Sequence, residues 1–110
     1  FSLGVEVPEA FYLRAQALFH LGQFDDCVDD LTQMIGHKPR DWNAYWIRGL
    51  ANENMALYLN ATNDFTKVIE LAPTFEEVYL HRADCYEKLG SFDWARRDRE
   101  RYNTVVSQKK

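Results

Sequence analysis

The sequence predicts an all-α fold made of three similar helix-turn-helix units. Apolar residues recur at intervals of three and four positions, which is typical of amphipathic helices. The whole pattern then repeats every 34 residues, as at Phe11, Tyr45 and Tyr79. No helix of such a unit can bury its apolar stripe alone, so each needs its partner helix and a neighbouring unit.

The central unit, from Trp42 to Pro73, shows the pattern most clearly. The stripe of its first helix passes through Tyr45, Gly49, Asn52 and Met55. The stripe of its second helix passes through Tyr58, Ala61, Phe65, Val68 and Leu71. Between the two helices, Ala56 and Leu57 leave room for a tight turn.

Alignment of the three units brings residues of one kind into register. Two positions hold only small residues, which are Ala15, Gly49 and Ala83 at the first and Cys27, Ala61 and Ala95 at the second. A third position is apolar throughout and holds Leu21, Met55 and Leu89. Because two antiparallel helices approach closely only where both lack bulk, we expect Gly49 to face Ala61.

This combination of features resembles the tetratricopeptide repeat (TPR) family over about residues 8–108. The 34-residue period, the paired small residues, the aromatic positions, and Pro39 and Pro73 all match that family. The resemblance implies a right-handed superhelical solenoid of three repeats. It also implies that the first helices of successive repeats line a concave groove.

Three departures from the family pattern are informative. Asn52 stands where the family usually has tyrosine, as at Tyr86. Ala56 replaces the glycine that usually supplies a positive φ in the turn, so we expect a wider turn there. In the third repeat Arg99 replaces an apolar residue, so we expect the last helix to end the stack with a charged outer face.

We divide the chain into a lead-in and three repeats that form one domain. The boundaries are 1–7, 8–41, 42–75 and 76–110, the last including a C-terminal tail. The expected helices are about 8–21, 24–35, 42–55, 58–71, 75–89 and 92–106. Gly36 and Asp41 are expected to cap the end of the second helix and the start of the third. Thr74 and Glu77 are expected to form a capping box for the fifth.

Composition favours a folded domain that does not cross a membrane. A hydrophobic content of 46% and an aromatic content of 15% argue against disorder. No apolar run approaches the length of a transmembrane helix. The chain opens on Phe1 rather than Met, so we expect a piece of a longer chain or part of a larger complex. Cys27 and Cys85 lie in no metal-binding motif, which indicates a reducing, cytoplasmic environment.

Charge is distributed unevenly along the chain. Residues 1–93 are acidic, residues 94–110 are basic, and the formal net charge is −4. The acidic body disfavours nucleic acid as the partner of the whole domain. The basic segment contains Arg96, Arg97, Arg99 and Arg101. We interpret it first as a solvated last helix; docking of an acidic partner and binding of RNA or DNA remain open alternatives.

The sequence contains no convincing catalytic, cofactor or metal site. Asp25, Asp26 and Asp29 have the Asp-Asp-x-x-Asp spacing that some prenyl-diphosphate enzymes use for Mg²⁺, but this chain is too short for their deep cavity. Acidic residues in a first helical turn are explained by the helix dipole. His81 and Asp84 could pair on one helix face, but no nucleophile accompanies them. We therefore predict a non-enzymatic protein without cofactors.

The groove predicts a partner-binding surface of aromatic and acidic character. Its candidate residues are Tyr12, Gln16, Phe19, Trp46, Leu50, Glu53, Leu80, His81 and Asp84. Five carboxylates are expected along it, from Glu9, Glu53, Glu77, Asp84 and Glu87. We expect a protein segment that is apolar or aromatic and carries Lys or Arg, because aromatic side chains anchor interfaces and acidic ones steer basic partners.

The resemblance also excludes one kind of partner. Co-chaperone TPR domains hold the terminal carboxylate of a peptide with Lys, Arg and Asn. The matching positions here hold Tyr12, Gln16, Ile47, Glu77 and His81. Chaperone tails are therefore not expected as ligands.

The sequence favours a protein-interaction scaffold or adaptor whose groove holds a partner peptide or helix. The alternative is an architectural spacer in a longer repeat array or a large multiprotein assembly. In that case the groove aromatics pack between helices or are covered by flanking repeats, and the groove stays unused.

Overall fold

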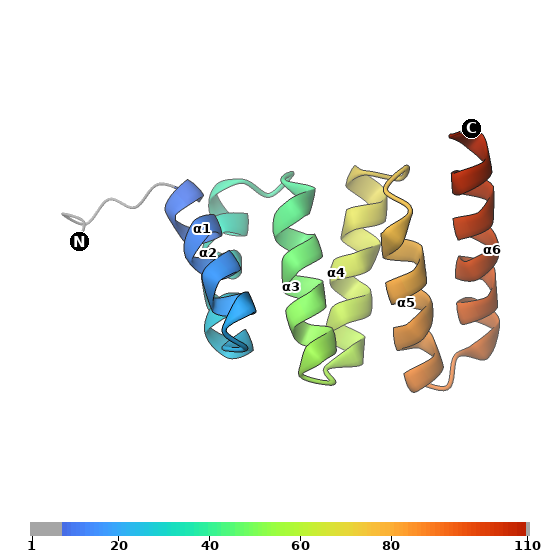
Figure 1. Ribbon diagram of the computed structural model, residues 1–110, viewed down its shortest axis with the longest axis horizontal. Coiled ribbons are helices and arrows are strands. Elements are labelled where there is room, and N and C mark those ends of the chain that lie inside the picture. Colours follow the sequence, from blue (N-terminus) through green and yellow to red (C-terminus); the bar gives the residue numbers. More distant parts are fainter. Residues whose placement is uncertain (1–7, 110) are drawn as a thin grey trace.

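A computed structural model describes residues 8–109 as six α-helices, with no strand among these residues. The helices are α1 (Pro8–His20), α2 (Phe24–His37), α3 (Trp42–Asn54), α4 (Tyr58–Leu71), α5 (Glu77–Lys88) and α6 (Phe92–Gln108). The predicted lead-in, 1–7, lies outside the described residues. The helices stand side by side in chain order and form an elongated array of 49 × 29 × 21 Å (Figure 1).

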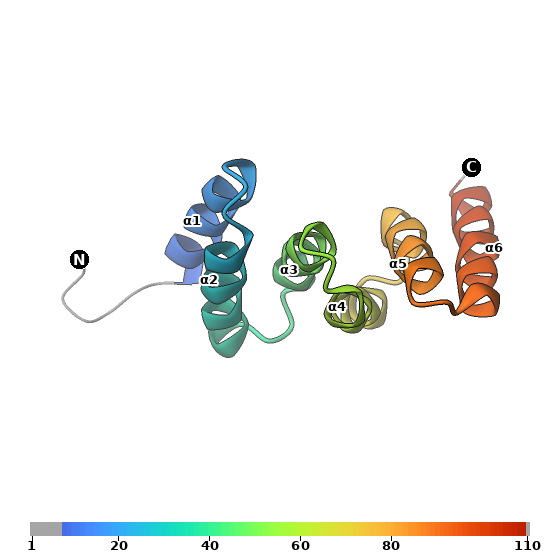
Figure 2. The same cartoon turned by 90° about the horizontal axis from the view of Figure 1, so that it is seen from below.

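The six helices pair into three repeats that stack in two layers. Each helix packs against its neighbours in the chain, and α1 also contacts α3 directly. In Figure 2, α4 lies below both α3 and α5. The first helices of the repeats therefore lie on one side of the array. The apolar core follows the stack as two clusters, one between α1, α2 and α3 and one spanning α3 to α6.

The aromatic position of each repeat is buried, as the register predicts. Phe11, Tyr45 and Tyr79 all lie in the core. The Tyr45 hydroxyl donates a hydrogen bond of 2.8 Å to the Pro39 carbonyl, and the Tyr79 hydroxyl donates one of 2.9 Å to the Pro73 carbonyl. Each of these hydrogen bonds joins the start of a helix to the loop before it and satisfies a carbonyl of that loop.

The closest helix approach in the second repeat differs from the expected one. A Cβ built on Gly49 would lie 2.5 Å from the Phe65 ring, so Gly49 faces Phe65 rather than Ala61. The expectation failed because it paired small residues with small ones. The structure instead fits a large ring into the space that the missing side chain leaves.

The turn at Ala56 is no wider than the two glycine turns. Ala56 has a φ of +61°, close to the values of +76° at Gly22 and +80° at Gly90. In all three turns the backbone N–H of the third residue beyond the helix bonds the carbonyl five residues earlier, as Leu57 does to Asn52 at 2.8 Å. Our expectation was wrong because helix packing imposes the left-handed conformation even on alanine.

Other local predictions divide between confirmed and wrong. Asp41 caps α3 by accepting a hydrogen bond from the Asn43 backbone at 3.1 Å. The predicted cap Gly36 lies inside α2, which ends at His37 and has Lys38 as its C-cap. The start of α5 has no side-chain cap, so the predicted capping box is absent. The third apolar position does not join the core, since Leu21 and Leu89 are exposed and Met55 is half-buried.

An arginine–aspartate pair links the two helices of every repeat, and the sequence analysis did not anticipate it. The pairs are Arg14–Asp30, Arg48–Asp64 and Arg82–Asp98. Each is bidentate, with nitrogen–oxygen distances between 2.7 and 3.2 Å. Such forked pairs are stronger and more specific than single hydrogen bonds.

Two of these arginines also join their repeat to the one before. Arg48 donates a hydrogen bond of 3.1 Å to the Thr32 hydroxyl of α2, and Arg82 donates one of 3.0 Å to the Thr66 hydroxyl of α4. One guanidinium therefore contacts three successive helices. Its five donors in a fixed plane suit this geometry.

We predict that Gly49→Leu unfolds the domain, because Leu has no space beside the Phe65 ring. Overpacking of this kind costs about 1–3 kcal/mol or more. Repeats gain stability from their neighbours, so loss of the middle repeat should uncouple both ends. Thermal melting followed by circular dichroism measures the effect. The matched control is Gly36→Ala, where the added Cβ meets nothing within 4 Å; an equal loss in both variants would contradict the prediction.

We predict unequal costs for removing the repeated carboxylates. Asp98→Ala should cost about 3–5 kcal/mol, because it leaves the Arg82 side chain, which is only 16% exposed, without its carboxylate partner. Asp30→Ala should cost less, since the Arg14 side chain is 56% exposed and water can solvate it. Asp93→Ala, which removes an exposed partner of Arg96, should cost about 0–1 kcal/mol. Urea unfolding gives all three values, and equal costs would show that burial does not set them.

Candidate partner-binding groove

A small apolar hollow lies between α1 and α3. Its volume is about 170 Å³, and its lining consists of Gln16, Phe19, His20, Ile47 and Leu50. The structure thus brings together three predicted groove residues from two repeats. The hollow offers apolar surface with polar groups at its edge, which is the usual composition of a binding pocket.

Phe19 and Tyr12 are only partly available to a ligand. Phe19 packs edge-on against Phe24, with ring centroids 5.3 Å apart. Tyr12 is half-buried against the same core cluster. Burial raises the pKa of Tyr12, and the charge of Asp41 adds to the effect. Both rings therefore contribute to the fold as well as to the groove.

Trp46 lies at the junction of the second and third repeats. Its ring is 4.9 Å from Phe75, 5.2 Å from His81 and 5.6 Å from Phe65, measured between centroids. It is not among the residues that line the hollow. The expected strip of Tyr12, Phe19 and Trp46 is therefore divided, with Trp46 packed against the third repeat.

Glu53 and His81 form a polar link between α3 and α5. The Nδ1 atom of His81 lies 2.8 Å from a Glu53 carboxylate oxygen. This hydrogen bond raises the pKa of His81, and it outweighs burial, which acts in the opposite direction. The charges of Glu53, Asp84 and Glu77 raise that pKa further. Protonated His81 thus meets a negative surface on both helices.

Most of the expected groove carboxylates are engaged within the fold. Arg99 bonds Asp84 at 3.1 Å and Glu87 at 2.8 Å. Leu80, another predicted groove residue, is half-exposed on the same helix as these two carboxylates. Glu9 pairs with Lys38 at 2.8 Å. The groove therefore keeps less negative charge than the sequence predicts.

Exposed Glu77 has no hydrogen-bond or ion-pair partner among residues 8–109. Asp84 and Glu87 together share the single cation of Arg99, so this group of three carries one net negative charge. The acidic character predicted for the whole groove is concentrated on α5.

The predicted basic surface on α6 is not a single patch. Arg96 pairs with Asp93 at 3.3 Å, and Arg99 turns back onto α5. The Arg97 guanidinium lies over the Trp94 ring, 5.1 Å from its centroid. Arg101 is exposed. The four arginines therefore have different surroundings.

The described residues offer little for metal or nucleophilic chemistry. Asp30 of the acidic run is occupied by Arg14. Between residues 8 and 109, no group of three or more His, Cys, Asp or Glu is placed to hold a metal ion. Burial raises the pKa of Cys27 to about 11 and that of Cys85 to about 12, so both thiols stay protonated at neutral pH. In the same range no helix is long and apolar enough to cross a bilayer.

A second hollow, on the side of the second helices, escaped the sequence analysis. Its volume is about 280 Å³, and its lining consists of Val28, Arg48, Asn52, Asn60, Asn63 and Asp64. The Asn52 amide donates a hydrogen bond of 3.1 Å to Asp64, whereas Tyr86 takes the matching position in the third repeat. The departure at Asn52 was the available signal, because a small side chain leaves a space that tyrosine would fill.

We predict a pH-dependent contribution of the Glu53–His81 pair to stability. The folded-state pKa of His81 is raised, so the contribution is complete below the unfolded value of about 6.5 and is lost as pH rises through the folded value. Wild type should therefore exceed Glu53→Gln in unfolding free energy more at pH 6 than at pH 9. The two proteins differ only at residue 53, so the comparison isolates this pair. If the two proteins differed in unfolding free energy by the same amount at both pH values, the pH-dependent contribution of the Glu53–His81 pair would be contradicted.

Comparison with known proteins gives one family match and several structural ones. A tetratricopeptide repeat family model matches residues 43–75. A serine/threonine-protein phosphatase T from Aspergillus oryzae is 35% identical over 82 residues, which are 74% of this chain and 17% of that protein. The chain therefore spans about a sixth of the length of this relative.

Solved structures match nearly the whole chain at low sequence identity. A crystal structure of MamA has a TM-score of 0.90 and 24% identity, and the match covers 93% of this chain and 60% of that one. PcrH in complex with the chaperone binding region of PopD has a TM-score of 0.88 and 17% identity, with 96% and 80% covered. The Arabidopsis OM64 TPR domain has a TM-score of 0.85 and 21% identity, with 92% and 84% covered. The described part of the chain therefore has the fold of tetratricopeptide repeat domains, and residues 43–75 match the model of that family.

Proposed function

We propose that this domain is a non-catalytic interaction scaffold that binds a protein segment in the groove along α1, α3 and α5. The observation that supports it best is the apolar hollow between α1 and α3. Phe19, Ile47 and Leu50 supply its apolar surface, while Gln16 and His20 supply polar groups. These five residues come from two repeats, so the hollow exists only in the stacked fold.

The hollow favours one apolar or aromatic anchor in the ligand. A buried anchor in a preformed pocket carries much of the energy of a protein interface. Gln16 and His20 are placed to bond the backbone of a segment that passes over the hollow. A short peptide would therefore bind through one anchor side chain in the hollow, while Gln16 and His20 would fix its register.

A basic residue in the same ligand fits the charge that remains on α5. Exposed Glu77 and the Asp84–Glu87–Arg99 group leave this helix net negative. Such charge acts mainly on the association rate and on register. Lys or Arg is therefore expected on the side of the ligand anchor that faces the third repeat.

The comparisons support this proposal at the level of the fold. PcrH was solved in complex with a region of another protein, PopD. The phosphatase relative is far longer than this chain, so we propose no phosphatase activity for the repeats themselves.

A second function, as a spacer in a longer array, is favoured by the outer face of α1. Leu13 and Leu21 are 65% and 70% exposed there. The matching residues of the second repeat, Ile47 and Met55, are half-buried where α2 packs against α3. Another helix placed before α1 would cover Leu13 in the same way, whereas the position of Leu21 stays 43% exposed at Leu89 even with a repeat before it.

We predict that peptides selected from a random library against the intact domain carry an apolar residue next to Lys or Arg. Leu50→Glu should weaken them by about 2 kcal/mol or more, since it places a charge in the hollow. Leu59→Glu is the matched control, because Leu59 is 63% exposed on α4 and lies outside the hollow. Fluorescence polarisation measures the affinities, and circular dichroism checks the fold.

The charged part of the groove is tested separately by Glu77→Lys combined with Asp84→Lys. This variant should mainly slow association and flatten its dependence on salt. Peptides that bind Leu50→Glu as well as wild type would contradict the groove proposal. Loss of a cellular partner on Leu13→Glu, with Leu50→Glu unaffected, would instead favour the spacer.

A further inference from the structure

The residues on the outward surface of the second helices differ from repeat to repeat, although the underlying frame of each repeat is the same. The frame is the arginine–aspartate pair that each repeat contains. Two positions beside it hold Asp26, Asn60 and Trp94 at the first and Asp29, Asn63 and Arg97 at the second. The same place is thus acidic in the first repeat, amide-lined in the second, and aromatic and basic in the third.

Trp94 is exposed for a reason other than the lack of a following repeat. Its side chain is 55% exposed on the second residue after the start of α6. Asp26 and Asn60 occupy the same position and are exposed as well, although a further repeat follows each of them. Stacking therefore does not cover this position. Phe92 differs, since its counterparts Phe24 and Tyr58 are half-buried.

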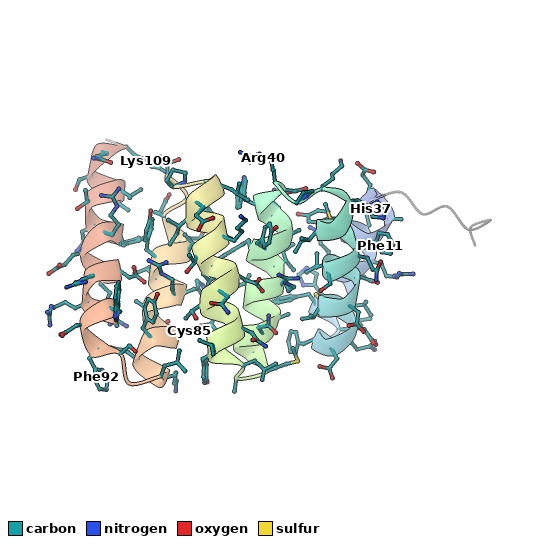
Figure 3. All side chains as sticks on the ribbon, turned by 180° about the vertical axis from the view of Figure 1, so that it is seen from behind. Phe11, His37, Arg40, Cys85, Phe92 and Lys109 are labelled. Carbon is teal, nitrogen blue, oxygen red and sulfur yellow. The ribbon has the colours of Figure 1, made fainter. Side chains whose placement is uncertain are left out.

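Trp94 belongs to a line of four side chains across α5 and α6, in which two aromatic rings lie between two arginines. Arg82 lies 5.4 Å from the Tyr86 ring, and Tyr86 and Trp94 have centroids 6.1 Å apart. The Arg97 guanidinium covers one face of the Trp94 ring at 5.1 Å. These contacts hold the indole in place, although much of it faces solvent. Figure 3 shows Phe92 projecting beyond the turn that begins the same helix.

Two arginines near Trp94 lack a carboxylate partner within residues 8–109. Asp93 pairs with Arg96, and Asp98 pairs with Arg82. Arg97 and Arg101 make no such pair in that range. Stacking occupies only the face of the Arg97 guanidinium, so its N–H groups stay free to bond an anion. The two residues are one helical turn apart, about 6 Å along the axis.

We propose that Trp94, Arg97 and Arg101 form a second interaction site, which binds an acidic protein segment with an apolar side chain. The apolar side chain packs on the exposed part of Trp94. Two carboxylates bond Arg97 and Arg101, and a helical ligand presents them four residues apart. Arg–carboxylate pairing is bidentate and directional, which suits this spacing. The site lies on the second helices and is independent of the groove.

A protein segment fits this surface better than nucleic acid does. Affinity for nucleic acid grows with the number of phosphates neutralised, and only two guanidiniums are free here. Arg97 already covers one face of the indole, which leaves less of the ring for a base to stack on.

The test uses a fluorescein-labelled peptide, EELEELEEL, and the intact domain. Fluorescence polarisation should show binding that weakens as salt is raised. Trp94→Asn with Arg97→Asn, which copies the second repeat onto the third, should weaken binding about tenfold or more. Arg96→Ala is the matched control, because Arg96 lies on the same helix and has its own partner. It should change the affinity less than twofold.

Two further measurements separate this site from the groove and from nucleic acid. Leu50→Glu should leave binding of EELEELEEL unchanged, and a ten-residue oligothymidylate should not displace the peptide. The converse graft, Asn60→Trp with Asn63→Arg, should raise the stoichiometry from one peptide to two. Absence of binding at millimolar peptide, binding that survives the double asparagine variant, or displacement by the oligonucleotide would overturn the proposal.

Discussion

The arginine–aspartate pair within each repeat, whose carboxylate is buried, is the interaction on which the rest of this structure depends. Taking two charges out of water is costly, and the cost is recovered only when geometry is good and the remaining donors are bonded. Arg48 and Arg82 meet both conditions, since each forks onto its aspartate and bonds a threonine of the preceding repeat. The pair therefore links the two helices of a repeat and, through the threonine, joins that repeat to the one before it.

Because this frame recurs, the surfaces around it can differ without changing the fold. On the side of the first helices, neighbouring repeats combine to form the hollow of Phe19, Ile47 and Leu50. On the side of the second helices, single repeats carry distinct chemistry at one fixed place, with Asn60 and Asn63 in the second and Trp94 and Arg97 in the third. The groove thus depends on stacking, whereas the outer surface depends on each repeat alone.

The groove also shows how internal pairing changes the charge that a partner meets. Glu53 pairs with His81, and Asp84 and Glu87 both pair with Arg99, so these partners offset part of their negative charge. These pairs connect α3 to α5 and α5 to α6, so they support the stack. The negative charge that remains lies on α5 and covers a smaller part of the groove than the number of acidic residues suggests.

The sequence by itself determined the all-α repeat fold, because the 34-residue period and the spacing of Phe11, Tyr45 and Tyr79 leave each helix with one face to bury. It also grouped Gln16, Phe19 and Leu50, which line one hollow in the structure. Tertiary structure alone decided that Gly49 receives Phe65, that Ala56 adopts a positive φ, and that Trp46 packs against Phe75 and His81. The arginine–aspartate pairs also appeared only there. The physical reason is that periodicity reports which face of a helix is buried, whereas partners across an interface depend on the size, rotation and charge of side chains from different helices.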